Sequence, residues 1–141
     1  MIKGLIITHG SLGNEMVSVA EGILEETVDI DSFSFDWRED GTETLGRLEK
    51  YLRKNQDHQI LIFTDMFGGS PTNISLKFNR ENIEVITGVN LPGLLKFLTH
   101  KDKYEDINFK ELVKLIKKES IDGINIISEY LGVKKNDQRN H

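Results

Sequence analysis

Apolar runs of strand length alternate along this 141-residue chain with segments whose apolar residues recur at helical spacing. The run at residues 2–8 is almost uninterrupted, which is typical of a strand covered on both faces. Further strands are predicted at residues 30–35, 59–64 and 83–87. Strands that alternate with amphipathic helices predict an α/β fold, with a doubly wound, mainly parallel four-stranded sheet and helices on both of its faces.

The elements between and after these strands are predicted from apolar spacing and from residues that favour helix starts. The first helix is expected at residues 14–26. A short helix is expected to run from Ser70 towards Phe78, because Ser70 and Pro71 are typical of an N-cap followed by proline at the first helical position. The apolar segment 124–127 is interpreted as a short fifth strand.

One domain at residues 1–132 with a polar tail at 133–141 is expected, because no linker or change of composition divides the chain. The formal net charge of −5 argues against nucleic acid or an anionic membrane as the main partner. The apolar runs are too short to span a bilayer and no secretory signal is visible, so a cytoplasmic location is expected. The absence of cysteine excludes disulfides, thiolate catalysis and cysteine-based metal sites.

Polar residues directly follow the first and third predicted strands, with His9 after one and Asp65 after the other. Parallel strands end at the same edge of a sheet, and a flavodoxin-like strand order makes these two strands neighbours at the switch point. The Asp65 carboxylate is therefore expected to reach one ring nitrogen of His9 and to leave the other nitrogen free as a nucleophile. This pairing predicts a catalytic histidine that carries a phosphoryl group.

Gly68, Gly69 and Ser70 are candidate phosphoryl-binding residues. The two glycines precede a helix start and can turn backbone N–H groups towards an anion, and the Ser70 hydroxyl is a further donor. These residues also have a purely structural interpretation. His9 could be a hydrogen-bonded structural residue, Asp65 could cap a backbone N–H, and residues 68–70 could form a plain turn before a helix. The other histidines offer no spacing typical of a metal site, so neither a metal nor another cofactor is expected.

Three motifs in order resemble one bacterial family, and they are Thr8-His9-Gly10, Asp65 with Phe67-Gly68-Gly69-Ser70-Pro71 and Asn73, and Gly88-Val89-Asn90-Leu91-Pro92. From Met1 to about Leu131 the chain resembles the mannose-type enzyme IIA (IIA-Man family) of the phosphoenolpyruvate-dependent sugar phosphotransferase system. The resemblance implies a phosphotransferase without a cofactor, in which phospho-HPr loads His9 and a IIB subunit unloads it. It also implies that Asp65 orients the His9 ring, and that the Gly68-Gly69-Ser70 turn surrounds the phosphoryl group.

The same resemblance implies an assembly. The family sheet has four parallel strands and an antiparallel edge strand that some dimeric members exchange, and residues 124–127 would be that strand. A homodimer is expected, which acts with a separate IIB polypeptide and only indirectly with the membrane IIC and IID subunits. Specificity lies in those membrane subunits, so the chain does not reveal which sugar is transported. Gly13 stands where many members carry alanine, and this departure is expected to loosen the first helical turn.

Four apolar residues are predicted in loops on the same edge of the sheet: Leu12, Trp37, Met66 and Phe67. We interpret them as part of a docking surface for HPr and IIB, because exposed apolar side chains beside a site mark contact surfaces. The alternative for Leu12 and Phe67 is that they pack into the core. Trp37 stands between two charged residues and is expected to be exposed.

Two other functions remain open from the residues themselves. One is a regulatory module that uses phosphorylated His9 as a signal. The other is a flavodoxin-like domain that binds FMN through the loop from Thr8 to Ser11, although flavin loops are usually richer in hydroxyl groups. Colour and FMN binding of the purified protein distinguish this last possibility from the others.

Overall fold

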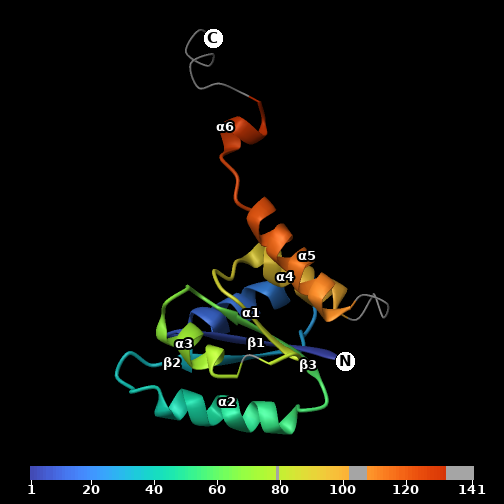
Figure 1. Cartoon of the computed structure of the whole chain (residues 1–141). Helices are drawn as coiled ribbons and strands as arrows, with labels where there is room; N and C mark the ends of the chain where they lie inside the picture. Colours follow the sequence, from blue (N-terminus) through green and yellow to red (C-terminus); the bar gives the residue numbers. More distant parts are fainter. Residues whose placement is uncertain (79, 102–107, 133–141) are drawn as a thin grey trace.

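The computed structural model describes residues 1–78, 80–101 and 108–132, and it is built on a sheet with strand order β2-β1-β3-β4 (Figure 1). The strands are β1 (Ile2–His9), β2 (Ile30–Phe35), β3 (Gln59–Thr64) and β4 (Ile83–Ile86). The helices are α1 (Leu12–Leu24), α2 (Thr42–Lys54), α3 (Ser70–Leu76), α4 (Leu91–His100), α5 (Phe109–Asp122) and α6 (Ile127–Tyr130). The pairings of β1 with β2, of β1 with β3 and of β3 with β4 are parallel, which confirms the predicted α/β class and the four-stranded parallel sheet.

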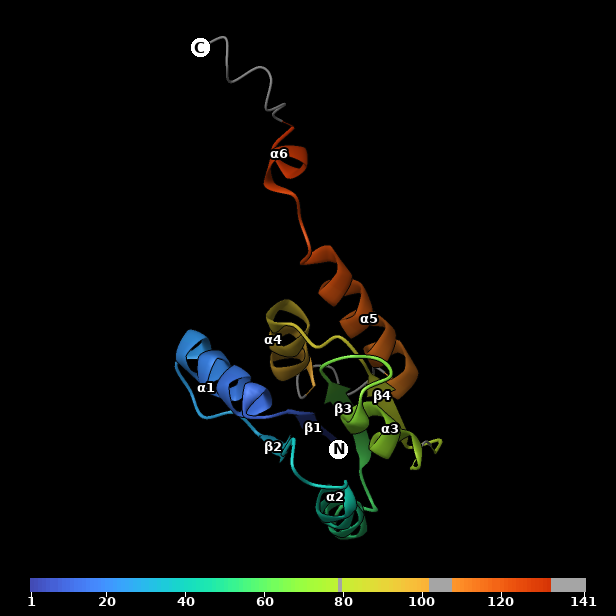
Figure 2. The same ribbon diagram turned by 90° about the vertical axis from the view of Figure 1, so that its left-hand side faces the viewer.

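Helices cover both faces of the sheet, and Figure 2 shows α2 on one side of the strands with α4 and α5 on the other. Successive side chains of β1 point into two different hydrophobic cores. Ile2 and Ile6 pack with residues of α1, α4 and α5. Leu5 and Ile7 pack on the opposite face, with residues of α2 and α3. The same alternation directs His9, the last residue of β1, towards the α2 and α3 side.

β1 lies between β2 and β3, and its register decides which loops meet at the carboxyl edge of the sheet. Ile7 lies opposite Thr64 of β3, which brings the loop after β3 beside the end of β1. On the other side His9 pairs with Phe35, and the Gly10 N–H donates to the Phe35 carbonyl at 2.9 Å. The predicted adjacency of β1 and β3 is therefore confirmed, and the loops after β1, β2 and β3 begin side by side.

α1 begins at Leu12, two residues before its predicted start, and its first turn is tightly packed. The Gly13 N–H donates to the Thr8 hydroxyl at 2.8 Å, so the end of β1 satisfies a donor of the helix start. A Cβ on Gly13 would lie 2.8 Å from Ser32 Oγ and 2.9 Å from Ile6 Cγ2, which is closer than packed atoms approach. The expectation that Gly13 loosens this turn is wrong, because the missing side chain lets α1 approach the sheet.

The prediction of a fifth strand at residues 124–127 is wrong. Residues 124–126 lie outside any helix or strand, and α6 begins at Ile127. α5 leads the chain away from the sheet, and α6 projects beyond it (Figure 1). A strand requires a hydrogen-bonding neighbour, and within the described residues this segment reaches no strand of the sheet. The described chain therefore lacks the antiparallel edge strand.

The remaining expectations about organisation concern the domain boundary and the membrane. The boundary predicted after residue 132 stays a prediction, because the tail 133–141 lies outside the described residues. Over the part of the chain that the structure describes, no helix combines the length and the apolar character that crossing a membrane requires.

Candidate functional site

His9 and Asp65 are 56 residues apart in the sequence and meet at the carboxyl edge of the sheet. Asp65 Oδ2 accepts two hydrogen bonds from the same residue, one from the His9 backbone N–H at 2.9 Å and one from the ring Nδ1 at 2.7 Å. Both side chains are largely buried, with 17% of His9 and 12% of Asp65 exposed. The structure thus brings together the imidazole and the carboxylate that the sequence placed at this edge.

The Asp65 carboxylate is ionised and fixed in orientation. Burial alone would raise its pKa, but the hydrogen bonds from His9 outweigh burial and hold the pKa below the ordinary value of 3.8. The second oxygen, Oδ1, accepts the Met66 N–H at 3.0 Å. Because an ionised carboxylate can only accept hydrogen bonds, we assign the ring proton of His9 to Nδ1, and Nε2 then presents a lone pair.

Gly69 lies against the free edge of the His9 ring. A Cβ at this position would lie 2.9 Å from His9 Cε1 and 3.6 Å from Nε2, so the missing side chain keeps the space beside Nε2 open. The neighbouring Gly68 turns the chain with a φ of +82°, a conformation that favours glycine. The two glycines therefore do different things: one turns the loop, and the other leaves room at the nucleophile.

The loop between β3 and α3 is held by a threonine, Thr72, whose role was not predicted from the sequence. The Thr72 hydroxyl donates to the Met66 carbonyl at 2.6 Å and lies 2.6 Å from the Thr64 hydroxyl. Both threonine side chains are fully buried. These bonds tie the loop to the end of β3 and to the first turn of α3. Threonine is common near helix starts, so its presence alone carried no signal of this role.

Ser70 begins α3 and does not cap it. The N-cap is Gly69, and Pro71 lies in the first turn of the helix. The predicted N-cap role of Ser70 is therefore wrong. Within the described residues its hydroxyl makes no hydrogen bond to the protein, so it is available as a donor next to Gly69.

The His9 ring also contacts two aromatic side chains from the end of β2 and the turn after it. Trp37 stacks on the ring, with centroids 4.8 Å apart and an interplanar angle of 23°. Phe35 meets the ring edge-on, with centroids 5.9 Å apart. The prediction of Trp37 on this edge is confirmed, whereas its contact with His9 was not predicted. The contact could have been predicted from the parallel pairing of β1 with β2. This pairing places Phe35 opposite His9, and Trp37 follows two residues later.

The predicted docking residues form an exposed group, which we call the apolar rim: Leu12, Trp37, Met66 and Phe67. The exposed fraction is 76% for Trp37 and 79% for Phe67, and it is 49% for Leu12 and 55% for Met66. The alternative in which Leu12 and Phe67 pack into the core is therefore wrong. Trp37, Met66 and Phe67 lie in loops next to His9, whereas Leu12, which was predicted in a loop, is the first residue of α1.

Other features of the molecule lie apart from this site. Among residues 1–78, 80–101 and 108–132, no three His, Cys, Asp or Glu side chains gather as metal ligands would. A cavity of about 570 Å³ beside Arg53, Ile60 and Arg80 lies at the amino ends of β3 and β4, at the edge opposite His9. Its position separates it from the pair of His9 and Asp65.

The sequence matches the family EIIA-man, described as "PTS system fructose IIA component", over residues 3–117. It is 30% identical over 137 residues to the PTS system fructose-specific EIIA component of Bacillus subtilis (strain 168), covering 93% of this chain and 90% of that protein. It is also 30% identical over 123 residues, 85% of this chain, to the PTS system mannose-specific EIIAB component of Escherichia coli (strain K12). The chain spans 38% of the length of that longer relative.

Solved structures share the fold. The phosphotransferase system component EIIA from Streptococcus agalactiae superposes with a TM-score of 0.78 at 26% identity, covering 92% of this chain and 99% of the other. The mannose/sorbose specific IIA subunit from Enterococcus faecalis has a TM-score of 0.78 at 19% identity, covering 88% of this chain and 92% of the other. The second likeness concerns the fold alone.

Proposed function

The chain belongs to the EIIA-man family of phosphotransferase-system components, and from this premise we propose that it is a phosphocarrier in sugar uptake. Phospho-HPr loads a phosphoryl group onto His9, and a IIB subunit on a separate polypeptide receives it. The observation that carries the proposal is the pair of His9 and Asp65, in which a buried carboxylate holds Nδ1 and leaves Nε2 open beside Gly69. The membrane IIC and IID subunits are reached only through IIB.

The proposed transfer is a direct displacement at phosphorus. Nε2 of His9 attacks the phosphorus atom of phospho-HPr while the bond from phosphorus to the donor histidine breaks. No proton leaves His9, because Nδ1 keeps its hydrogen in the bond to Asp65. The ring gains positive charge as the new bond forms, and the Asp65 carboxylate stabilises that charge. Transfer to IIB uses the same geometry, with the phosphorylated His9 as the donor.

We assign the apolar rim to the docking of HPr and IIB, one after the other. Each partner must bring a side chain within bonding distance of Nε2, so both must cover the residues around it. Exposed apolar side chains next to a reactive group are typical of such contact surfaces. The strong exposure of Trp37 and Phe67 supports this assignment.

The proposed function is tested by phosphoryl uptake. Protein incubated with phosphoenolpyruvate, enzyme I and HPr is expected to gain one phosphoryl group per chain, which acid treatment removes, as is typical of phosphohistidine. Intact mass before and after acid treatment measures the gain and the loss. Uptake that does not depend on HPr, or a product that survives acid, would contradict the proposal.

Two alternative functions, an FMN-binding domain and a regulatory module, can be distinguished from the proposed phosphocarrier. Membership of the EIIA-man family argues against the FMN-binding alternative. The regulatory alternative keeps the same chemistry at His9 and differs in the recipient. A phosphorylated chain that passes nothing to IIB subunits would favour the regulatory module over the carrier.

Replacing Gly69 by alanine is expected to slow transfer from phospho-HPr by on the order of tenfold. The backbone at Gly69 has a φ of −81°, which any residue adopts, so the effect is steric and the fold is retained. The added methyl group would lie 2.9 Å from His9 Cε1 and forces the ring or the loop to move. Rapid-quench measurement of phosphoryl transfer gives the rate.

The matched control is Gly46→Ala in α2, where an added Cβ meets nothing within 4 Å. This variant is expected to transfer at the wild-type rate. If Gly69→Ala also transferred at that rate, the open space beside Nε2 would have no role in the reaction.

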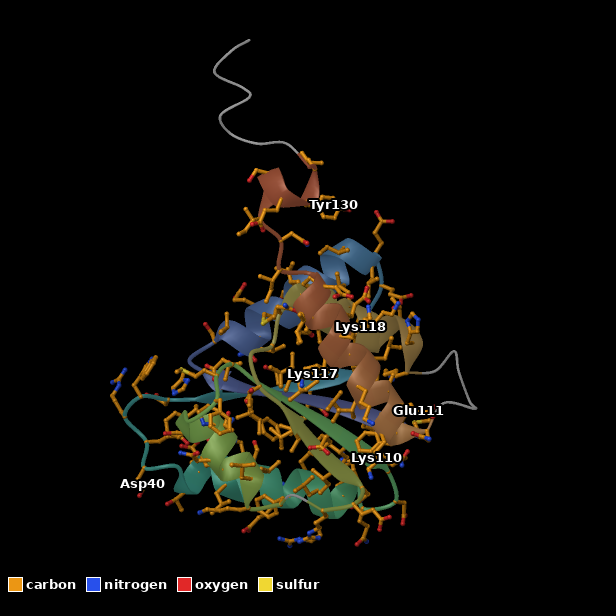
Figure 3. All side chains as sticks on the ribbon, turned by 45° about the horizontal axis from the view of Figure 1, so that its top comes forward. Asp40, Lys110, Glu111, Lys117, Lys118 and Tyr130 are labelled. Atoms are coloured by element: carbon orange, nitrogen blue, oxygen red, sulfur yellow. The ribbon has the colours of Figure 1, made fainter. Side chains whose placement is uncertain are left out.

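We also propose that the chain forms a homodimer that buries the segment 124–131. Its exposed apolar residues are Ile124, Ile126, Ile127, Tyr130 and Leu131. Figure 3 shows Tyr130 on α6, beyond Lys117 and Lys118 of α5 and away from the sheet. An exposed apolar cluster of this kind is typical of a surface that contacts another chain.

Replacing Ile124, Ile126 and Ile127 together by aspartate is expected to produce monomers, because the charges oppose burial of the segment. Sedimentation equilibrium measures the molecular mass in solution. Ile23→Asp on α1 changes an isoleucine that is also exposed and is expected to leave the dimer intact. A wild-type protein that sediments as a monomer would refute this assembly.

A further inference from the structure

Trp37 is both exposed to solvent and stacked on His9, and a role in docking explains only the exposure. Its side chain is 76% exposed, yet its indole stacks on the largely buried His9 ring. The two ring planes differ by only 23° at a centroid distance of 4.8 Å. A residue used only for docking needs its outward face, whereas the inward face of this indole covers the ring of the nucleophile.

The indole is presented by a hydrogen-bonded turn that follows β2. Asp36 Oδ1 accepts the Arg38 N–H at 2.9 Å, and the Asp36 carbonyl accepts the Glu39 N–H at 3.1 Å. The Glu39 carboxylate accepts the Asp36 N–H at 3.2 Å. These bonds position Trp37 through its own chain segment, so the stack forms without a partner protein.

Trp37 contacts the face of the His9 ring, whereas the other groups of the site contact its edges. Asp65 occupies the Nδ1 edge, and Gly69 borders the edge that carries Cε1 and Nε2. The lone pair of Nε2 lies in the plane of the ring. An indole on the face of the ring therefore does not obstruct attack by Nε2, but it faces any positive charge that the ring acquires.

We infer that Trp37 is a positioning residue whose indole stabilises the positively charged ring of phosphorylated His9. The inference rests on the proposed function, because the ring gains this charge when Nε2 bonds to phosphorus while Nδ1 keeps its proton. Indole attracts a cation across its face more strongly than the other aromatic side chains do. When the bond to phosphorus breaks, its electron pair returns to Nε2 and the ring is neutral again. Trp37 therefore favours the phosphorylated state.

The stack itself is tested by NMR on the unphosphorylated protein. The ring current of an indole moves signals of protons over its face upfield, so the C–H signals of the His9 ring are expected upfield in the wild type. In Trp37→Leu they return towards the positions of an unstacked histidine. Phe67→Leu, a matched change elsewhere in the apolar rim, leaves them in place. Unchanged His9 signals in Trp37→Leu would overturn the inference.

The stabilisation is tested by the equilibrium constant for transfer between phospho-HPr and this protein. Docking alters how fast equilibrium is reached, whereas only the stability of the end states alters its position. Trp37→Leu is expected to shift the equilibrium about 2- to 5-fold towards phospho-HPr, and Trp37→Phe is expected to retain most of the wild-type value. Phe67→Leu is expected to slow transfer without moving the equilibrium.

The two proposals fail in different ways. If the wild-type protein takes up no phosphoryl group, the proposed function fails and the role of Trp37 fails with it. If uptake is normal and the equilibrium constants of the wild type and Trp37→Leu agree, only the role of Trp37 is overturned.

Discussion

Replacing His9 by glutamine is expected to abolish phosphoryl uptake from phospho-HPr. Glutamine leaves the backbone N–H of residue 9 donating to Asp65 Oδ2, so the fold and the loop after β3 are retained. Its amide nitrogen has no available lone pair, because that electron pair is delocalised into the carbonyl group. Uptake is therefore lost with the nucleophile, and intact mass shows no added phosphoryl group.

His58→Gln makes the same change at the opposite edge of the sheet, directly before β3. This control is expected to take up one phosphoryl group, as the wild type does. Circular dichroism and thermal unfolding compare the fold of both variants with that of the wild type. Phosphoryl uptake by a folded His9→Gln protein would assign the reaction to another residue.

Replacing Asp65 by asparagine is expected to lower the rate constant of transfer by about 10²- to 10⁴-fold. The two carboxylate oxygens accept from three N–H groups: Oδ2 from the backbone and the ring of His9, and Oδ1 from Met66. Asparagine offers one oxygen and one NH₂ group, so at least one of these donors faces another donor. When the NH₂ group faces Nδ1, the ring proton moves to Nε2 and the nucleophile is blocked.

Asp65→Asn also removes the negative charge that stabilises the phosphorylated ring. The change of tautomer and the loss of charge therefore both lower the rate of transfer. Single-turnover transfer from phospho-HPr, followed by rapid quench, measures the rate constant. Asp57→Asn removes a charge from an exposed acid between α2 and β3 and is expected to leave the rate unchanged. Transfer at the wild-type rate by Asp65→Asn would exclude the carboxylate from the mechanism.

The strands and their order could be predicted from the sequence because buried parallel strands leave a strong local signal. Near-continuous apolar runs end in polar loops, and the rules for connecting parallel strands restrict how such strands are arranged. The contact between His9 and Asp65 followed from that order alone. It required no knowledge of side-chain conformation, only that β1 and β3 are neighbours.

The features that could not be predicted depend on what a segment meets in space. Residues 124–127 have the composition of a strand, but a strand forms only beside another strand, and α5 leads this segment away from the sheet. The stack of Trp37 on His9 depends on the turn at residues 36–39, which is set by hydrogen bonds of Asp36 and Glu39. Residue 13 has no room for a side chain because α1 packs closely on the sheet, and the sequence does not reveal that distance.

A single carboxylate connects the tip of the β3–α3 loop with the imidazole. Asp65 binds the Met66 N–H through one oxygen and His9 through the other, while Thr72 anchors the Met66 carbonyl. We expect a partner that displaces Met66 to move the His9 ring as well, because two hydrogen bonds to Asp65 connect the Met66 N–H with the ring. A partner that docks incorrectly on this loop is then expected to misalign the Nε2 lone pair too.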